Sequence, residues 1–412
     1  MEKLAIDGGK PVRTEPFPPR IMFDEREKKA ALEVIEKTMT GNQALDRYGG
    51  VHVDAYEKEV AAYFGTKFAT ATSAGTAAIH AALGALRLEP GTEVITSPIT
   101  DPGTVAPILM QNCIPIFADV DYDTLNITAE TIAERLSEKT RVIIPVHLAG
   151  QPCDMDPIMK LAREHNLIVI EDVAQAHGAK YKGRFAGSIG DMGTLSLMSG
   201  KHMTSGGQGG MVLTDNEEFY WNAKRFADRG KPFGSSEPTN LFLGLNYRMT
   251  ELEAAIGRVQ LTKLADIVAK RRKTAESLRN AMQGLQAFRL WKIRDDVDAT
   301  YWFLFLHFDS SKMKVSKVQC AAALQAEGMP VGAHYVTVMY KQKWIRDQVT
   351  YGGSRCPWSC PHARKIDHYD PCPQAEKALA DYMTLYMHEG WGEREVEDVI
   401  QALQKVEHYY LK

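Results

Sequence analysis

The sequence has few cysteines, no long apolar run and no excess of charge of either sign. Six cysteines among 412 residues are too few for a disulfide scaffold. No stretch reaches the roughly 18 apolar residues that a membrane helix needs, and the first residues lack the apolar core of a signal peptide. The 49 Lys and Arg and 52 Asp and Glu are interspersed and form no basic field. We therefore expect a cytoplasmic protein that binds a small molecule and neither a membrane nor nucleic acid.

Three motifs that would indicate other functions are also missing or weak. No Gly-x-Gly-x-x-Gly follows a predicted strand, which argues against a nicotinamide dehydrogenase. The chain has no basic helix-turn-helix stretch, as a DNA-binding regulator would need. Cys356, Cys360 and Cys372 lie near His362 and His368, but their spacing fits a zinc site only loosely. We expect an ordered loop there and no metal.

Short apolar strands alternate with helical segments between about residues 55 and 215. Apolar runs without polar alternation predict strands buried on both faces, as in a mostly parallel sheet between helices. The predicted strands are 93–96, 114–119, 141–147, 167–172, 193–197 and 211–214, and the predicted helices are 77–86, 129–136 and 155–165. The expected class is therefore α/β.

A second, smaller unit is predicted after a long amphipathic helix over residues 249–277. A strand over 299–308 and a terminal helix over 393–408 indicate that this unit is an α+β domain. The expected division is an N-terminal arm (1–20), a large domain (21–260) and a small C-terminal domain (261–412). The prolines of the arm predict an extended segment that packs on another surface, for which a neighbouring subunit is one candidate.

An acidic strand end and a lysine beside a glycine-rich turn give the first indication of chemistry. Glu171 and Asp172 end an apolar run, and Lys201 lies just before the turn at 205–210. Ligands bind at the carboxyl ends of parallel strands. An acid there holds the pyridine nitrogen of pyridoxal phosphate protonated, while a lysine forms a Schiff base with its aldehyde. Most charged residues lie on the solvated surface, so this acid and lysine alone do not indicate a cofactor site. The residues around them must supply further evidence.

The surroundings supply candidate ligands for the rest of such a cofactor. The sequence Ser-Ala-Gly-Thr at 73–76 opens the helix over 77–86, where free amides favour a phosphate. Ser196 lies within reach of the same phosphate, Gln175 of the ring's phenolic oxygen, and His177 of Asp172. Each also has an ordinary structural interpretation, as a helix cap or as a polar residue that closes a turn.

Four segments together resemble one family. They are Ser-Ala-Gly-Thr at 73–76, Glu-Asp-Val-Ala-Gln-Ala-His-Gly at 171–178, the segment 196–201 with Gly-Gly at 209–210, and Gly-Leu-Asn-Tyr-Arg-Met-Thr-Glu-Leu-Glu-Ala-Ala-Ile-Gly at 244–257. This pattern is similar to the DegT/DnrJ/EryC1/StrS aminotransferases, which are sugar and cyclitol aminotransferases of fold type I. The similarity runs in order over most of the chain.

The resemblance implies an enzyme that uses pyridoxal 5′-phosphate and passes through its pyridoxamine phosphate form. Lys201 would form the Schiff base and move protons, Asp172 would pair with the pyridine nitrogen, and Gln175 would contact the ring hydroxyl. Some relatives are dehydratases with histidine in place of the lysine, and here the position falls on Lys201 and not on His202. A dehydratase or lyase on the same fold remains the alternative to transamination.

The resemblance also implies a phosphate site shared between subunits. Gly75, Thr76 and Ser196 would bind the phosphate of their own subunit's cofactor. Asn246 would reach the cofactor of the other subunit, which implies a homodimer.

Three features depart from the family pattern. Asp101 stands where relatives place an aromatic residue over the cofactor ring, and an acid does not stack in that way. Either its carboxylate meets the substrate or the far face of the cofactor, or the loop is shifted by one residue. Gln208 stands where many relatives carry an acid, and the segment 341–370 is unusually long. These departures concern the substrate and not the reaction class.

The expected substrates are an amino donor and a ketone. The resemblance implies L-glutamate or L-glutamine as donor and a keto sugar, nucleotide-linked or free, or a keto cyclitol as acceptor. The arm resembles those of cyclitol and aminohydroxybenzoate members, which favours a cyclitol-type ketone. His334 and Tyr335 are candidates for the acceptor pocket, with a structural histidine as the alternative.

Overall fold

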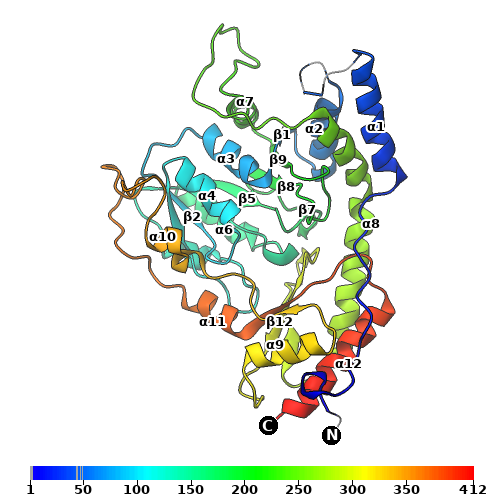
Figure 1. Cartoon of the computed structure of the whole chain (residues 1–412). Coiled ribbons are helices and arrows are strands. Elements are labelled where there is room, and N and C mark those ends of the chain that lie inside the picture. Colours follow the sequence, from blue (N-terminus) through cyan, green and yellow to red (C-terminus); the bar gives the residue numbers. More distant parts are fainter. Residues whose placement is uncertain (1–2, 43–44, 47, 49) are drawn as a thin grey trace.

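A seven-stranded sheet between helices forms the centre of the computed structural model, which describes residues 3–42, 45, 46, 48 and 50–412 (Figure 1). The strand order is β1-β9-β8-β5-β4-β2-β3. Strand β9 runs antiparallel to both of its neighbours, and the other pairs in this sheet are parallel. The strands are β1 (Phe68–Thr72), β2 (Glu93–Thr96), β3 (Ile114–Phe117), β4 (Thr140–Ile144), β5 (Ile168–Asp172), β8 (Met192–Ser196) and β9 (Gly210–Thr214). The predicted α/β class with a mostly parallel sheet is confirmed.

Both faces of this sheet are buried, as the apolar runs predicted. Val169 and Ile170 are neighbours on β5, each 0% exposed, yet they belong to different apolar clusters on opposite faces. The helices of this part are α2 (His52–Phe64), α3 (Gly75–Ala85), α4 (Pro102–Met110), α5 (Ala129–Ala133), α6 (Met155–Glu164) and α7 (Glu217–Phe226). Burial on both faces leaves the strand ends as the places where polar side chains reach a cavity.

The smaller part of the chain is built on a four-stranded antiparallel sheet. Its strand order is β10-β12-β14-β13. The elements are β10 (Phe288–Leu290), β12 (Leu304–Phe308), β13 (Val331–Gly332), β14 (Tyr382–Leu385), α9 (Lys317–Ala326), α10 (Lys343–Arg346), α11 (Pro373–Asp381) and α12 (Glu393–Tyr410). A further small sheet joins β6 (Lys180–Tyr181), β7 (Arg184–Phe185) and β11 (Val297–Asp298). The expected α+β character of the C-terminal part is confirmed.

Helix α8 (Glu251–Ala281) connects the two parts and is longer than the predicted helix. It runs along one side of the molecule, past both sheets, with α1 (Glu25–Met39) packed on its first half (Figure 1). It begins at a capping box, in which the Thr250 side chain accepts a hydrogen bond from the amide of Glu253. Because α8 is continuous across residue 260, we propose that the two domains share this helix and do not meet at a flexible linker.

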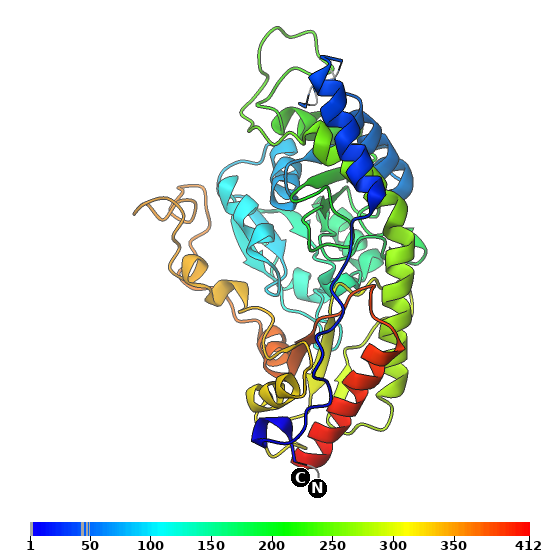
Figure 2. The same cartoon turned by 45° about the vertical axis from the view of Figure 1, so that its right-hand side comes forward.

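The N-terminal arm lies along the outside of the small domain and of α8 (Figure 2). Leu4 is fully buried, and the carboxylate of Glu327 accepts hydrogen bonds from the amides of Ala5 (2.9 Å) and Val12 (3.0 Å). Trp391 packs against Phe17 with ring centroids 4.7 Å apart. The surface on which the arm packs therefore includes its own small domain.

Two further expectations concern segments outside the main sheet. The predicted strand over 299–308 is reduced to β12, because Tyr301 adopts a left-handed backbone (φ 51°) that a strand does not accommodate.

Cys356 and Cys372, two of the cysteines near the C-terminal loop, make separate contacts. The thiol of Cys372 is buried against the carbonyl of Phe117, whereas Cys356 contacts Asn112. Among the described residues, no three His, Cys, Asp or Glu side chains converge as metal ligands. Nor is any described helix both long and apolar enough to cross a membrane.

Candidate active site

A cavity of about 210 Å³ lies at the carboxyl ends of β1, β5 and β8. Seven residues predicted from the sequence line it: Gly75, Thr76, Asp101, Asp172, Gln175, Ser196 and Lys201. Further lining residues are Ala74, Ile79, Thr100, Gly103, Thr104, Ala174, Met198, Gln208 and Trp302. The structure therefore brings together residues that are far apart in the chain, in the place where parallel sheets bind ligands.

One end of the cavity is the N-terminus of α3. Ala74 at the N-cap has no side chain to accept from the first helix amides, so these donors are left for a ligand. A Cβ added to Gly75 would lie 2.6 Å from the Cβ of Ser196, a separation that atoms do not tolerate. Glycine is therefore required at position 75 for the Ser196 hydroxyl, at the end of β8, to lie beside the first amides of α3. The hydroxyl and the amides together can bind an anion.

The other end of the cavity holds the carboxylate of Asp172, at the end of β5. Its Oδ2 accepts a hydrogen bond from the hydroxyl of Thr104 (2.7 Å), and its Oδ1 accepts from the amide of Ala174 (3.0 Å). Burial raises the pKa of Asp172 above its usual value, against the effect of these hydrogen bonds and of Lys201. A buried carboxylate in this state favours a partner that brings a positive charge.

The preceding acid, Glu171, points to the opposite face of the strand and has a structural role. Its carboxylate accepts hydrogen bonds from the amides of Gly187, Ile189 and Gly190 (2.7–2.9 Å). It is also 2.8 Å from Nε2 of His147. Burial opposes its ionisation, but these partners hold the pKa of Glu171 below its usual value. The side-chain alternation of a strand thus separates two adjacent acids, one to each face.

Lys201 lies in the loop after β8, and its amine faces the cavity. The amine is 3.8 Å from the centre of the Trp302 ring. Burial lowers the pKa of Lys201 to about 8, although Asp172 and Asp101 favour its charged form. Near neutral pH a useful fraction of this amine is therefore uncharged, as a nucleophile or a proton carrier requires.

Trp302 was not predicted from the sequence; it lines the cavity and also holds the backbone next to Lys201. Its indole Nε1 donates a hydrogen bond to the carbonyl of Gly200 (2.9 Å), the residue before Lys201. Thr104 was missed as well, since it meets Asp172 across 68 positions of sequence. Neither residue belongs to a local motif, so a pattern read along the chain does not find them.

Gln175 is fixed by two hydrogen bonds at the edge of the cavity. Its Oε1 accepts from the amide of Ala149 (2.8 Å), and its Nε2 donates to the hydroxyl of Tyr335 (2.8 Å). Burial raises the pKa of Tyr335, so this phenol is neutral. His334 is exposed and does not line the cavity. Of the two small-domain residues predicted for the acceptor, the structure brings Tyr335 to the site.

His177 does not touch Asp172. Its ring lies 5.5 Å from that of His202, the residue after Lys201, and both histidines are fully buried. Burial lowers the pKa of His177 to about 3, so its ring is neutral. The structure therefore gives His177 a place in the support of the lysine loop.

The two remaining predicted residues occupy exposed positions. Asp101 caps α4, where its Oδ1 accepts a hydrogen bond from the amide of Gly103 (2.8 Å), and the residue also borders the cavity. Asn246 lies outside the cavity of its own chain, on an exposed loop before α8.

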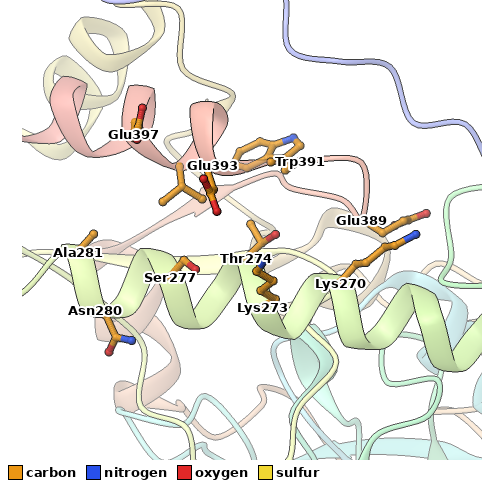
Figure 3. Close-up of a pocket in the computed structure, with 12 residues that line it drawn as sticks. Lys270, Lys273, Thr274, Ser277, Asn280, Ala281, Glu389, Trp391, Glu393 and Glu397 are labelled. Carbon is orange, nitrogen blue, oxygen red and sulfur yellow. The ribbon is translucent and has the colours of Figure 1, made fainter.

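A larger cavity of about 730 Å³ lies between α8 and the start of α12 (Figure 3). Its charged lining residues are Lys270, Lys273, Glu389, Glu393 and Glu397, and polar, small and apolar residues complete it. None of its residues borders the cavity around Lys201. Size alone is a poor guide here, because the smaller cavity lies at the carboxyl ends of parallel strands and holds the buried Asp172 and Lys201.

Comparisons of sequence agree with this site. The sequence model of the DegT/DnrJ/EryC1/StrS aminotransferase family matches residues 25–404. GDP-perosamine synthase of Escherichia coli O157:H7 is 35% identical over 279 residues, which cover 68% of this chain and 74% of that protein. A putative L-glutamine:3-amino-2,3-dideoxy-scyllo-inosose aminotransferase of Streptoalloteichus tenebrarius is 31% identical over 414 residues, which cover 98% and 97%.

Comparisons of structure agree as well. An aminotransferase from Psychrobacter cryohalolentis superposes with a TM-score of 0.84 at 32% identity, covering 96% of this chain and 99% of that one. 3-Amino-5-hydroxybenzoic acid synthase has the same fold, with a TM-score of 0.81 at 24% identity and coverage of 97% and 100%. The expected fold type I is confirmed. With a family match over nearly its whole length, the chain belongs to the DegT/DnrJ/EryC1/StrS family of pyridoxal phosphate-dependent aminotransferases.

Proposed function

We propose that this enzyme transfers an amino group from L-glutamate or L-glutamine to a keto sugar or keto cyclitol, with pyridoxal 5′-phosphate held in the cavity around Lys201. The observation that carries the proposal is the convergence of three groups in that cavity: an uncapped helix N-terminus, a buried carboxylate and a buried amine whose pKa is about 8. These are the partners that a phosphate, a pyridinium nitrogen and an aldehyde need.

The donor groups present fit this cofactor. The close approach of Gly75 to Ser196 forms an anion seat that a side chain at 75 would fill. In the proposal, the amides of Gly75 and Thr76 and the hydroxyl of Ser196 hold the phosphate, and Asp172 holds the ring nitrogen. Gln175 is fixed beside the site of the ring hydroxyl by its bonds to Ala149 and Tyr335.

The bound cofactor would supply an electron sink that stabilises negative charge on the donor's Cα. The chain supplies the proton carrier. The amine of Lys201 would take the proton from the donor's Cα and deliver it to C4′ of the cofactor, since its lowered pKa leaves both forms of the amine available near neutral pH. Asp172 would keep the ring nitrogen protonated, and Thr104 fixes the orientation of the Asp172 carboxylate. When bound, the cofactor would hold the amino group between the two half-reactions.

The acceptor class follows from the relatives. One relative is named for a GDP-linked amino sugar and another for an amino derivative of a cyclitol. The latter covers 98% of this chain and takes its amino group from L-glutamine according to its name. This agrees with the similarity of the arm to cyclitol members, so a keto cyclitol is the first acceptor to test.

The proposal predicts a spectral change with the amino donor alone. When L-glutamate or L-glutamine is added to the cofactor-loaded enzyme, the visible absorbance of the cofactor joined to Lys201 should fall. The near-ultraviolet absorbance of its pyridoxamine form should rise as the first half-reaction runs without a ketone. The amino acid that produces the change identifies the donor. Absence of any visible band after loading with pyridoxal phosphate would contradict the assignment of the site.

We also propose a homodimer in which Asn246 completes the phosphate site of the other subunit. The loop before α8 presents Leu243, which is 88% exposed, and Leu245, which is 41% exposed. Helix α1 presents Leu32, Ile35 and Met39 on its outer side. Apolar side chains on a projecting loop and a helix face are what a second copy would cover.

Shared sites predict complementation between two inactive variants. Asn246→Ala and Lys201→Ala should each have little activity alone. After random mixing by mild unfolding and refolding, heterodimers have one intact site, so about a quarter of the wild-type activity should return. A mixture of Lys201→Ala with Asp172→Asn is the control, since both residues serve the same subunit's site. If Asn246 served its own subunit, neither mixture would recover.

A further inference from the structure

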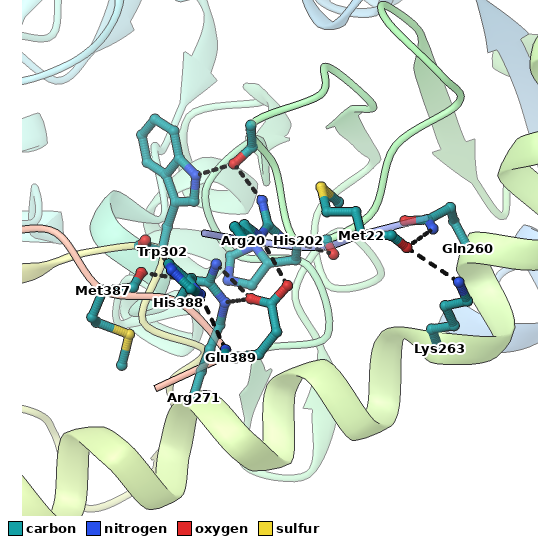
Figure 4. Close-up of polar contacts among 12 residues, drawn as sticks. Arg20, Met22, His202, Gln260, Lys263, Arg271, Trp302, Met387, His388 and Glu389 are labelled. Atoms are coloured by element: carbon teal, nitrogen blue, oxygen red, sulfur yellow. Dashed lines mark hydrogen bonds and ion pairs between the residues drawn. The ribbon is translucent and has the colours of Figure 1, made fainter. Parts of the chain in front are cut away.

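A cluster of two arginines and one glutamate joins the N-terminal arm, α8 and the small domain beside the lysine loop (Figure 4). The Nε of Arg20 donates to Oε1 of Glu389 (2.8 Å), and the other oxygen of Glu389 accepts from Nε of Arg271 (2.9 Å). The side chains of Arg20, Glu389 and Arg271 are 16%, 11% and 2% exposed. Burial opposes the ionisation of Glu389, but the two arginines hold its pKa below the usual value.

The free ends of both arginines bind backbone carbonyls near the active site. Arg20 donates to the carbonyls of Gly200 (3.2 Å) and His202 (3.4 Å), the two neighbours of Lys201 in the chain. Arg271 donates to the carbonyls of Tyr301 (2.9 Å) and Trp302 (3.0 Å). The indole of Trp302 donates in turn to Gly200. Both carbonyls that flank the lysine are therefore held from outside the cavity.

The backbone is fixed on each side of Arg20, in the arm and just after it, by other contacts. His388 Nε2 is 2.9 Å from the carbonyl of Pro18. Gln260 and Lys263 of α8 donate to the carbonyl of Met22 (2.9 and 3.1 Å). Contacts on both sides of Arg20 therefore fix the backbone from which its side chain reaches residues 200–202.

From these contacts we propose that Arg20 is a positioning residue for Lys201, through which the N-terminal arm sets the place of the lysine amine in the cavity. Arg20 does not border the cavity, so it acts through the backbone of residues 200–202. A guanidinium suits this role, because it binds a carboxylate and two carbonyls at once in one rigid plane, which a lysine ammonium does not do. The inference rests on the proposed function of Lys201, but its structural part is testable without cofactor.

The first test measures hydrogen exchange in the cofactor-free protein. Hydrogen bonds from a charged donor contribute enough that losing two of them should accelerate exchange of the amides at 199–203 by about tenfold or more in Arg20→Gln. Glu389 keeps Arg271 as its partner in this variant, so the fold is retained. Arg13→Gln is the matched control, because Arg13 is a buried arm arginine that pairs with Glu395 and Asp398 and not with the loop. Its exchange at 199–203 should change less than about twofold.

The second test measures kinetics of the loaded enzyme. Misplacement of the lysine should lower kcat by about 10- to 100-fold in Arg20→Gln while KM for the amino donor changes less than about threefold. The kcat of Arg20→Lys should remain low, since lysine keeps the positive charge but lacks the planar set of N–H donors that binds Glu389 and both carbonyls. Unchanged exchange at 199–203 in Arg20→Gln, equal acceleration in Arg13→Gln, or full activity of Arg20→Lys would each overturn the proposal. A wild-type enzyme without transaminase activity would instead refute the proposed function and leave the exchange result standing.

Discussion

Replacement of Lys201 by alanine is expected to lower turnover by at least about 10³-fold, because the same amine joins the cofactor and carries the proton. The loaded variant should also lack the visible absorbance of the cofactor joined to lysine. Steady-state assays with the amino donor and a keto cyclitol, together with absorbance spectra, measure both effects. Ordinary activity in Lys201→Ala would remove the basis of the proposed mechanism.

Lys317 provides a matched control for this experiment. It is as buried as Lys201, at 8% exposure each, and burial likewise lowers its pKa to about 8. Its amine donates to the carbonyls of Leu379 and Tyr382 in the small domain and faces no cavity residue of the site. Lys317→Met should therefore destabilise the protein by about 1–3 kcal/mol through unsatisfied carbonyls, with kcat of the folded enzyme unchanged. A lowered lysine pKa thus becomes functional only where the amine meets a cavity.

The second large effect is expected for Asp172→Asn, which should lower kcat/KM by about 10²- to 10³-fold. Asparagine keeps the shape of the side chain but has no charge with which to hold a protonated ring nitrogen. In the cofactor-free protein the same change should not reduce the melting temperature at pH 7. Burial raises the pKa of Asp172, so ionisation above that pKa weakens the folded state, and asparagine removes this penalty.

The adjacent acid should behave in the opposite way. The pKa of Glu171 is held below its usual value in the folded protein, so Glu171 stabilises the fold at pH 7 and loses this contribution as the pH falls through that pKa. Glu171→Gln should therefore lower the melting temperature, while the surviving folded enzyme keeps most of its kcat. Thermal unfolding and kinetics of the two variants, measured side by side, separate the roles. Equal catalytic loss in both would contradict the assignment of Asp172.

The chemistry of this site was predictable from sequence where the residues form local patterns. Asp172 follows an apolar strand directly, and Gly75 opens an alanine-rich helix, so each carries its signal in its own segment. Thr104, Trp302 and Arg20 carry no such signal. They reach the site across 68, 102 and 180 or more positions, and only the folded chain shows which surfaces meet.

The same distinction holds for the elements. Strand β2 was predicted at the observed residues, since three successive apolar or β-branched positions, Val94 to Thr96, follow a turn at Gly91 and precede Pro98. Helix α8 extends to Ala281, beyond its predicted end, because Leu278 still packs into the core of the small domain. The strand predicted over 299–308 begins only at Leu304, because Arg271 binds the carbonyls of Tyr301 and Trp302 that a strand would use in its ladder.

The continuity of α8 limits how this enzyme can be recombined with its relatives. A chimera joined at residue 260 would place its seam inside a 31-residue helix, about 46 Å long. At that seam the fully buried Gln260 donates to Glu27 of α1 (2.7 Å) and to the carbonyl of Met22, just after the arm. Residues from two parents would then have to repack against each other. A seam placed after Ala281 leaves α8 and its contact with α1 to a single parent, but it separates the arm from its partners Glu327 and Glu389 in the small domain. A graft of the small domain should therefore carry the arm of the same parent.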